Sequence, residues 1–241
     1  TGAVALVIAI PVMVVLYLVG WPWFLGLLLG LVAAAALIWP KTKHPADVVL
    51  ASFRGRRPGE TRDARLINLV EGLSLSTGVT EPTVVILEEP AGNAMTVSDD
   101  DGVTIVLTQG LLDSLDRMQL EGVVAELLIR AKDGDADLAT AVASLVSGLS
   151  SGILKPFAPF VSSRAVALFD EDRDLLADQA AVGVTRYPPA LASAFAALKK
   201  SGSTQPSGVA AAYGHLWLIP PPNALVPSHP LDLRIDVLEE I

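Results

Sequence analysis

The chain of 241 residues is 51% hydrophobic, contains no cysteine and three histidines, and carries a formal net charge of −9. The absence of cysteine excludes disulfide bonds and Cys-ligated zinc. A mean hydropathy of +0.51 is high for an ordinary globular domain, which indicates a membrane segment. The acidic balance argues against a nucleic-acid-binding protein, so no nucleic-acid partner is expected.

Residues 3–39 carry no charged side chain and form two apolar runs, 3–19 and 23–39, separated by a Gly-Trp-Pro break. Each run would reach about 26 Å as a helix, at the short end of the spanning range. The pattern predicts a transmembrane hairpin over residues 1–40, with the lipid bilayer as a partner. Two consecutive runs without a small-residue cleavage pattern disfavour a cleaved signal peptide.

A basic juxtamembrane linker is expected at residues 41–61, directly after the hairpin. Residues 41–65 carry seven basic and three acidic groups, whereas residues 66–241 carry ten and twenty-three. Positive charge beside a membrane segment stays on the cytoplasmic side. The pattern therefore predicts a multi-pass cell-membrane protein whose domain, residues 62–241, faces the cytoplasm. Because the chain begins with Thr rather than Met, we expect further sequence upstream.

Within this domain, helical and β signals together predict a mostly helical α+β fold with a small antiparallel sheet. The expected helices cover residues 62–77, 118–132, 163–184, 189–199 and 231–240. The expected strands cover residues 83–87, 94–98 and 103–108, and the last two flank an Asp-Asp-Asp-Gly turn signal. Residues 201–222, rich in Gly, Pro and Ser, are expected to form a loop.

Leu138–Leu154 is uncharged but rich in Ser, Ala and Gly. A third membrane crossing there would leave the helices before and after it on opposite sides of the bilayer. We therefore expect a buried or interface-lying helix.

Five short segments resemble, in their order and spacing, the motifs of one membrane peptidase family. They are Asn93-Ala94-Met95 with the strand and turn at 105–112, Val123-Val124-Ala125 with 132–135, Arg173–Asp178, Thr185–Leu191, and Ser228-His229-Pro230-Leu231. Together they resemble the HtpX-like membrane zinc metallopeptidases, relatives of the CAAX prenyl proteases. The resemblance implies a bacterial membrane protein with a zincin-type, metallopeptidase-like domain.

The window at residues 126–130 departs from the H-E-x-x-H motif that this family carries. By the resemblance, Glu126 stands at the first His, Leu127 at the general base and Arg130 at the second His, while Asp174 stands at the third ligand and Asp178 at a second-shell position. A guanidinium has no lone pair to offer a metal. The resemblance therefore implies no catalytic residue, no bound zinc and no other cofactor.

The departure favours a catalytically inactive, membrane-anchored homologue that acts as a binding or scaffold protein. Its expected partner is a membrane protein or an extended peptide, the latter adding to the strand at Asn93, Ala94 and Met95. A plainer alternative is a subunit that stabilises another membrane protein.

The enzymatic alternative is an active membrane zinc metalloendopeptidase with atypical ligands, in which His215 or His229 joins Glu126 and Asp174. Each histidine is more simply structural or exposed. Arg130 is predicted to take the place of zinc and to bridge Glu126, Asp174 or both. Because Glu126 and Arg130 fall outside the apolar stripe of their helix, an exposed pair of little energetic value is the alternative.

Overall fold

The computed structural model describes most of the chain from residue 44 onward. The described ranges are 44–150, 155–156, 158–202, 204–206 and 211–241, with scattered positions between 10 and 29. The predicted hairpin over 1–40 therefore lies mostly outside the described residues. Within the described part of the chain, no helix combines the length and the apolarity that a membrane crossing requires.

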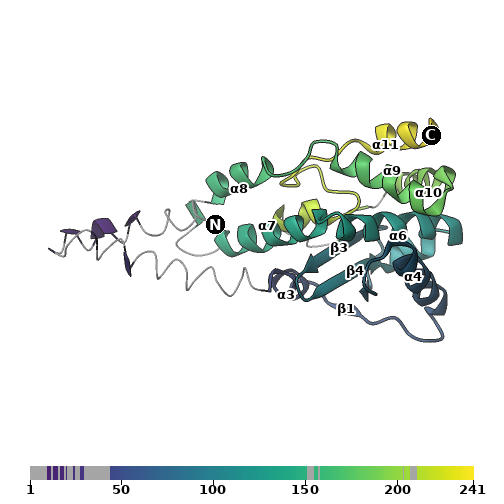
Figure 1. The fold of residues 1–241 in the computed structure, drawn as a ribbon, viewed down its shortest axis with the longest axis horizontal. Coiled ribbons are helices and arrows are strands. Elements are labelled where there is room, and N and C mark those ends of the chain that lie inside the picture. The colour runs from purple at the N-terminus through teal and green to yellow at the C-terminus, as the bar shows by residue number, and fades with distance from the viewer. Residues whose placement is uncertain are drawn as a thin grey trace.

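The described domain is mostly helical, as predicted, with a small sheet on one side (Figure 1). The helices before the middle of the chain are α3 (Pro45–Leu50), α4 (Ala64–Thr77), α5 (Gln109–Ser114) and α6 (Arg117–Lys132). They are followed by α7 (Asp135–Leu149), α8 (Ala158–Val166), α9 (Arg173–Thr185), α10 (Pro188–Ser201), the 3-10 helix η2 (Ala211–Leu216) and α11 (Leu231–Glu239).

The sheet contains β1 (Gly55–Arg56), β2 (Thr83–Leu87), β3 (Ala94–Asp99) and β4 (Gly102–Thr108), in the order β1-β2-β4-β3. The β3–β4 hairpin is antiparallel, as predicted from its turn signal. The expectation of a wholly antiparallel sheet is wrong, because β2 and β4 are parallel. The hairpin places β3 at the outer edge, so β4 lies next to β2 and runs in the same direction.

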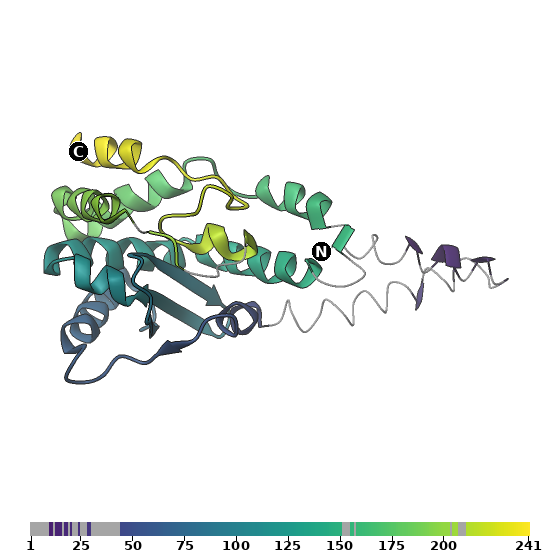
Figure 2. The same ribbon diagram turned by 180° about the vertical axis from the view of Figure 1, so that it is seen from behind.

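The two faces of the sheet pack against different helices. Along β4, Ile105 and Leu107 face the larger core, which α4, α6, α9 and α10 complete, while Val106 faces a second core with α3, α7 and η2. Figure 2 shows α9, α10 and α11 stacked over α6 on the side away from the sheet. Gly122 permits the close crossing of α6 and α10, since a Cβ there would lie 3.0 Å from the Leu191 backbone nitrogen. Helix α6 is therefore the central element of the domain.

The single helix expected over residues 163–184 is wrong, because the structure divides this segment into α8 and α9. Between them, the Asp172 backbone N–H donates to Asp170 Oδ1 at 2.9 Å, the kind of local bond by which Asp forms turns. Phe169 turns inward there and packs edge-on against the His215 ring. The break redirects the chain so that α9 lies along α6.

Three further segments were expected from the sequence to be linker, helix and loop. The basic stretch at 41–61 contains α3 and β1, which join the second core and the sheet. Helix α7 is buried along one face and packs against α3, β3 and η2, so the buried or interface-lying helix expected over Leu138–Leu154 is found as a buried helix for residues 138–149, while residues 151–154 lie outside the described residues. The loop at 201–222 contains η2 and the fully buried Trp217.

Candidate functional site

Glu126 and Arg130 lie on α6 and are 0% and 5% exposed. The expectation that they fall on an outer face is wrong, because α6 has the sheet on one side and α9 and α10 on the others. Every residue from Gly122 to Arg130 is buried. A charge at this depth has to be paired, since burying it alone costs several kcal/mol.

The Arg130 guanidinium contacts one carboxylate oxygen of Glu126 with two nitrogens. Both Nε and Nη2 lie 2.6 Å from Glu126 Oε1, and Nη1 lies 3.8 Å from Asp135 Oδ2 on α7. The predicted bridge from Arg130 to Glu126 is thus confirmed by the geometry. Asp174 does not take part in it, and among the described residues Asp135 is the second partner of Arg130.

Asp174, at the first turn of α9, is bound instead by the segment that precedes α11. His229 Nδ1 lies 2.7 Å from Oδ1, while Ser228 Oγ and the His229 backbone N–H both donate to Oδ2 at 2.7 Å. Burial acts to raise the pKa of Asp174, but the hydrogen bonds from His229 and Ser228 outweigh it and hold the pKa at about 2. Asp174 is therefore a carboxylate that fixes the C-terminal segment.

Arg234 on α11 completes the cluster, and the sequence interpretation missed it. Its Nε and Nη2 each lie 2.7 Å from an oxygen of Asp178, in a bidentate pair, and Nη2 reaches Glu126 Oε1 at 3.5 Å. Nη1 donates to the Leu218 carbonyl at 2.9 Å, and the guanidinium stacks over the Phe195 ring. The sequence does contain a signal for Arg234. It lies three residues after Leu231 and four before Leu238, a spacing that puts all three on one face of α11, and the burial of that face makes the arginine a candidate for a buried partner.

The cluster leaves two of its polar atoms without a partner in the described structure. Burial raises the pKa of Glu126 although Arg130 and Arg234 both favour its charged form, and its Oε2 makes no hydrogen bond. Arg173 pairs with Asp135 at 3.2 Å and donates to the His215 carbonyl, but its Nη1 has no acceptor. Burial and the neighbouring Arg130 lower the pKa of Arg173 to about 10.

The strand proposed to bind a peptide is β3, at the edge of the sheet. Met95 forms an antiparallel bridge with Trp217, and the Leu218 N–H donates to the Ala94 carbonyl at 2.7 Å. The Asn93 amide extends this pairing, since its Oδ1 accepts from the Ile219 N–H and its Nδ2 donates to the Ile219 carbonyl. The chain's own segment 217–219 therefore occupies this end of the edge.

Comparison with known proteins shows which family the chain belongs to. No family model matches the chain. A protein of Dictyoglomus thermophilum named Protease HtpX homolog is 30% identical over 187 residues, which cover 66% of this chain and 62% of that protein. Proteins of the same name from Tropheryma whipplei and Salinibacter ruber are 33% and 23% identical, covering 69% and 90% of the chain and 66% and 88% of each relative. The chain belongs to the HtpX-like family. It spans about three fifths of the length of the Dictyoglomus relative.

A zinc ion, which a metallopeptidase of the HtpX-like family would hold, does not fit the residues present. The guanidinium of Arg130 carries no lone pair and covers Glu126 Oε1. Leu127, at the position of the general base, is fully buried and apolar. Among the described residues, no group of three or more His, Asp or Glu side chains is arranged to hold a metal.

The two histidines of the enzymatic alternative lie in different places. His229 reaches Asp174, as described, whereas the His215 ring lies 3.1 Å from the Ala139 carbonyl through Nε2. Burial lowers the pKa of His215 to about 4, against a smaller opposing effect of the Ala139 carbonyl. The structure therefore brings one histidine to Asp174 and none to Glu126.

Proposed function

We propose that this HtpX-like chain is a catalytically inactive, membrane-anchored homologue of a zinc metalloendopeptidase that acts as a binding or scaffold protein. The observation that carries the proposal is the buried pair of Arg130 and Glu126, two positions where the family motif has metal-binding histidines. The cluster links α6 to α7 through Asp135 and to α11 through Arg234, which also pairs with Asp178 on α9.

The energetics support an inactive centre. A tight structural zinc site is worth roughly 10–16 kcal/mol and needs three or four good ligands. Here a permanent cation replaces one ligand, and inserting a second cation beside it would add repulsion in a low-dielectric site. Loss of the general base alone lowers a hydrolytic rate by about 10²–10⁴-fold.

Two further parts of the proposal rest on sequence. The apolar runs at 3–19 and 23–39 support membrane anchoring, and the basic residues that follow them support a cytoplasmic domain.

A peptide that added to β3 beside Met95 would have to displace the segment at 217–219, which includes a fully buried Trp217. A binding surface elsewhere on the domain is therefore easier to reach.

Metal analysis of the full chain, purified in an uncharged detergent, tests the inactivity directly. We expect much less than one zinc per chain after dialysis against zinc, and no chelator-sensitive cleavage of casein. A matched control restores the family motif with Glu126→His, Leu127→Glu, Arg130→His and Asp174→Glu, and it should bind zinc if the fold accepts a metal.

One zinc per wild-type chain would overturn the proposal, as would casein cleavage that is lost in an Asp174→Ala variant. The second result would favour the enzymatic alternative with His229 and Asp174 as ligands. An inactive wild type with a zinc-binding restored variant would show that the residues at 126, 127, 130 and 174, rather than the fold, exclude the metal.

A further inference from the structure

The turn between α8 and α9 and the segment that precedes α11 lie side by side (Figure 1) and line a surface cavity of about 560 Å³. Most of the residues that line this cavity, the α8–α11 groove, are apolar: Val166, Ala167, Phe169, Val226, Pro227 and Pro230. Asp170, Glu171, Ser228 and His229 supply its polar groups. The groove therefore offers an apolar surface with charged side chains at one side.

The charge of the groove has one sign. No lysine or arginine lines it, whereas the exposed residues Asp170 and Glu171 do. Asp170 uses Oδ1 to accept from the Asp172 N–H, and Glu171 makes no ion pair or hydrogen bond with any described residue. His229 adds no net positive charge, because its ring is paired with the Asp174 carboxylate at 2.7 Å. The groove is thus complementary to a cation.

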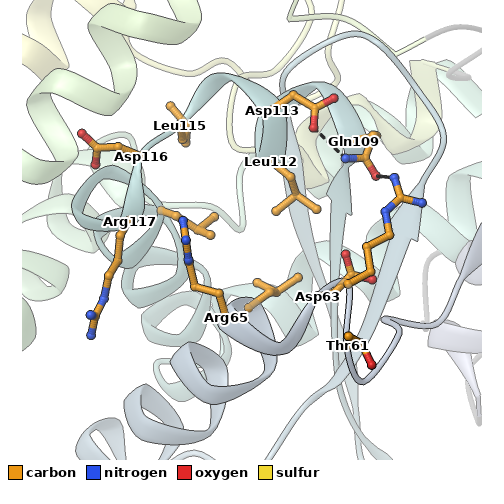
Figure 3. Close-up of a pocket in the computed structure, with 12 residues that line it drawn as sticks. Thr61, Asp63, Arg65, Gln109, Leu112, Asp113, Leu115, Asp116 and Arg117 are labelled. Atoms are coloured by element: carbon orange, nitrogen blue, oxygen red, sulfur yellow. Dashed lines mark hydrogen bonds between the residues drawn. The ribbon is translucent and has the colours of Figure 1, made fainter.

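Another surface cavity of the domain shows the contrast. The cavity of about 440 Å³ at the beginnings of α4 and α6 is lined by arginines, including Arg65 and Arg117, and also by Asp63, Asp113 and Asp116 (Figure 3). Charges of both signs surround that cavity and favour no charged ligand. A cleft lined by a single sign of charge, in contrast, raises the local concentration of ligands of the opposite sign.

One wall of the groove is irregular chain whose peptide groups are unpaired in the described structure. No backbone–backbone hydrogen bond joins Val226, Pro227 or Ser228 to any described residue. Carbonyl groups of this kind accept hydrogen bonds from the N–H groups of an extended peptide, which supply affinity while side chains supply specificity. A small organic cation would meet the carboxylates but leave this wall and most of the apolar surface uncovered.

We propose that the α8–α11 groove binds an extended segment of a partner protein in which arginine or lysine alternates with apolar residues. The basic side chains pair with Asp170 and Glu171, and the apolar side chains cover Ala167 and Pro227. The proposal rests on the proposed function as a binding protein and names the chemistry of the partner. Since no residue at 126–130 lines the groove, a zinc-binding wild type would overturn the inactivity without removing the groove.

The test measures binding of a short fluorescein-labelled peptide of alternating Arg and Val to the full chain in uncharged detergent, by fluorescence anisotropy, with protein-free micelles as the blank. We expect saturable binding that weakens as salt is added, as exposed ion pairs do. The variant Asp170→Asn/Glu171→Gln should weaken binding by about fivefold, because two exposed ion pairs are lost. Asn at 170 keeps an acceptor for the Asp172 N–H.

Two further variants separate charge from apolar contact. The matched control Glu81→Gln/Asp100→Asn makes the same change of net charge at two exposed positions outside the groove, and it should change affinity by less than about twofold. Ala167→Trp leaves the charge unchanged but fills part of the groove. It should weaken binding by about tenfold or more, since the apolar side chains of the peptide lose the surface that they bury.

The proposal is overturned if the basic peptide shows no saturable binding, or if Ala167→Trp binds it as tightly as the wild type does. Equal affinities of the groove and control double variants would also overturn it, and would leave Asp170 and Glu171 only their electrostatic effect on the beginning of α9. So would equal binding of a peptide in which Gln replaces Arg, or equal competition by free arginine amide, which would assign the groove to a small cation. Circular dichroism of each variant checks that these exposed substitutions preserve the fold.

Discussion

Arg130 and Glu126 form the ion pair at the centre of the buried cluster, and their energetic role depends on both being present. Because the pair is nearly inaccessible to solvent, removing one member leaves the other as a buried charge with incomplete compensation. The two side chains therefore stabilise the domain as a pair, and neither is expected to do so alone.

We predict that Arg130→Ala lowers the free energy of unfolding by about 3–5 kcal/mol. The double variant Glu126→Leu/Arg130→Leu should cost clearly less than Arg130→Ala, since it removes both charges and fills the space with apolar atoms. Denaturant unfolding followed by circular dichroism measures both. An Arg130→Ala variant as stable as the wild type would show that the ion pair contributes nothing to the free energy of unfolding.

His215 supplies a prediction on pH. Its folded pKa of about 4 lies below the ordinary value of 6.5, so the unfolded chain binds the additional proton first as the pH falls. The contribution of neutral His215 to stability is thus complete above pH 6.5 and is lost as the pH drops toward 4. In His215→Gln this dependence should disappear.

The difference in unfolding free energy between wild type and His215→Gln, measured from about pH 7 to about pH 4, should change by on the order of 2–3 kcal/mol. Gln keeps a donor near the Ala139 carbonyl, so the comparison isolates the titration. Parallel curves for the two proteins would mean that the ring is accessible enough to protonate without penalty.

At the scale of elements, one end of the outer edge of β3, at Ala94 and Met95, is closed by a segment far away in the sequence. Trp217 pairs with Met95, and the Asn93 side chain binds both the N–H and the carbonyl of Ile219 as well as the Thr204 carbonyl. An exposed strand edge is a template for association with other chains. The segment 217–219 protects this one.

Asn93→Ala should therefore lower the free energy of unfolding by about 2–4 kcal/mol, because it leaves several buried backbone groups without partners. Asn68→Ala, an exposed asparagine on α4, serves as the control and should stay within about 0.5 kcal/mol of wild type. We also expect Asn93→Ala to self-associate more readily in analytical ultracentrifugation. Equal stability of the two variants would show that the Asn93 side chain does not hold the segment 217–219 against β3.

For the whole molecule, the distribution of charge leads to a topology prediction. The proposed hairpin places both ends of residues 41–241 on the cytoplasmic side. Reporter fusions placed after Lys43 and after Ile241 should both report a cytoplasmic location. Reporters on opposite faces would mean that Leu138–Leu154 crosses the membrane.

The sequence by itself determined the local elements whose signals are short-range. The β3–β4 hairpin follows from its turn residues, and α6 follows from the helical spacing of its apolar residues. The order of the motifs also sufficed to indicate the HtpX-like family, and the spacing of four residues between Glu126 and Arg130 sufficed to predict their pairing.

Only the tertiary structure decided what surrounds these elements. Spacing along α6 assigned Glu126 and Arg130 to an outer face, but α9 and α10 cover that face, so the pair is buried. Asp135 and Arg234, which contact the pair, and His229, which contacts Asp174, all come from other segments of the chain. No local pattern specifies which charged groups will meet. The parallel pairing of β2 with β4 and the closure of β3 by Trp217 likewise depend on long-range packing, which periodicity does not encode.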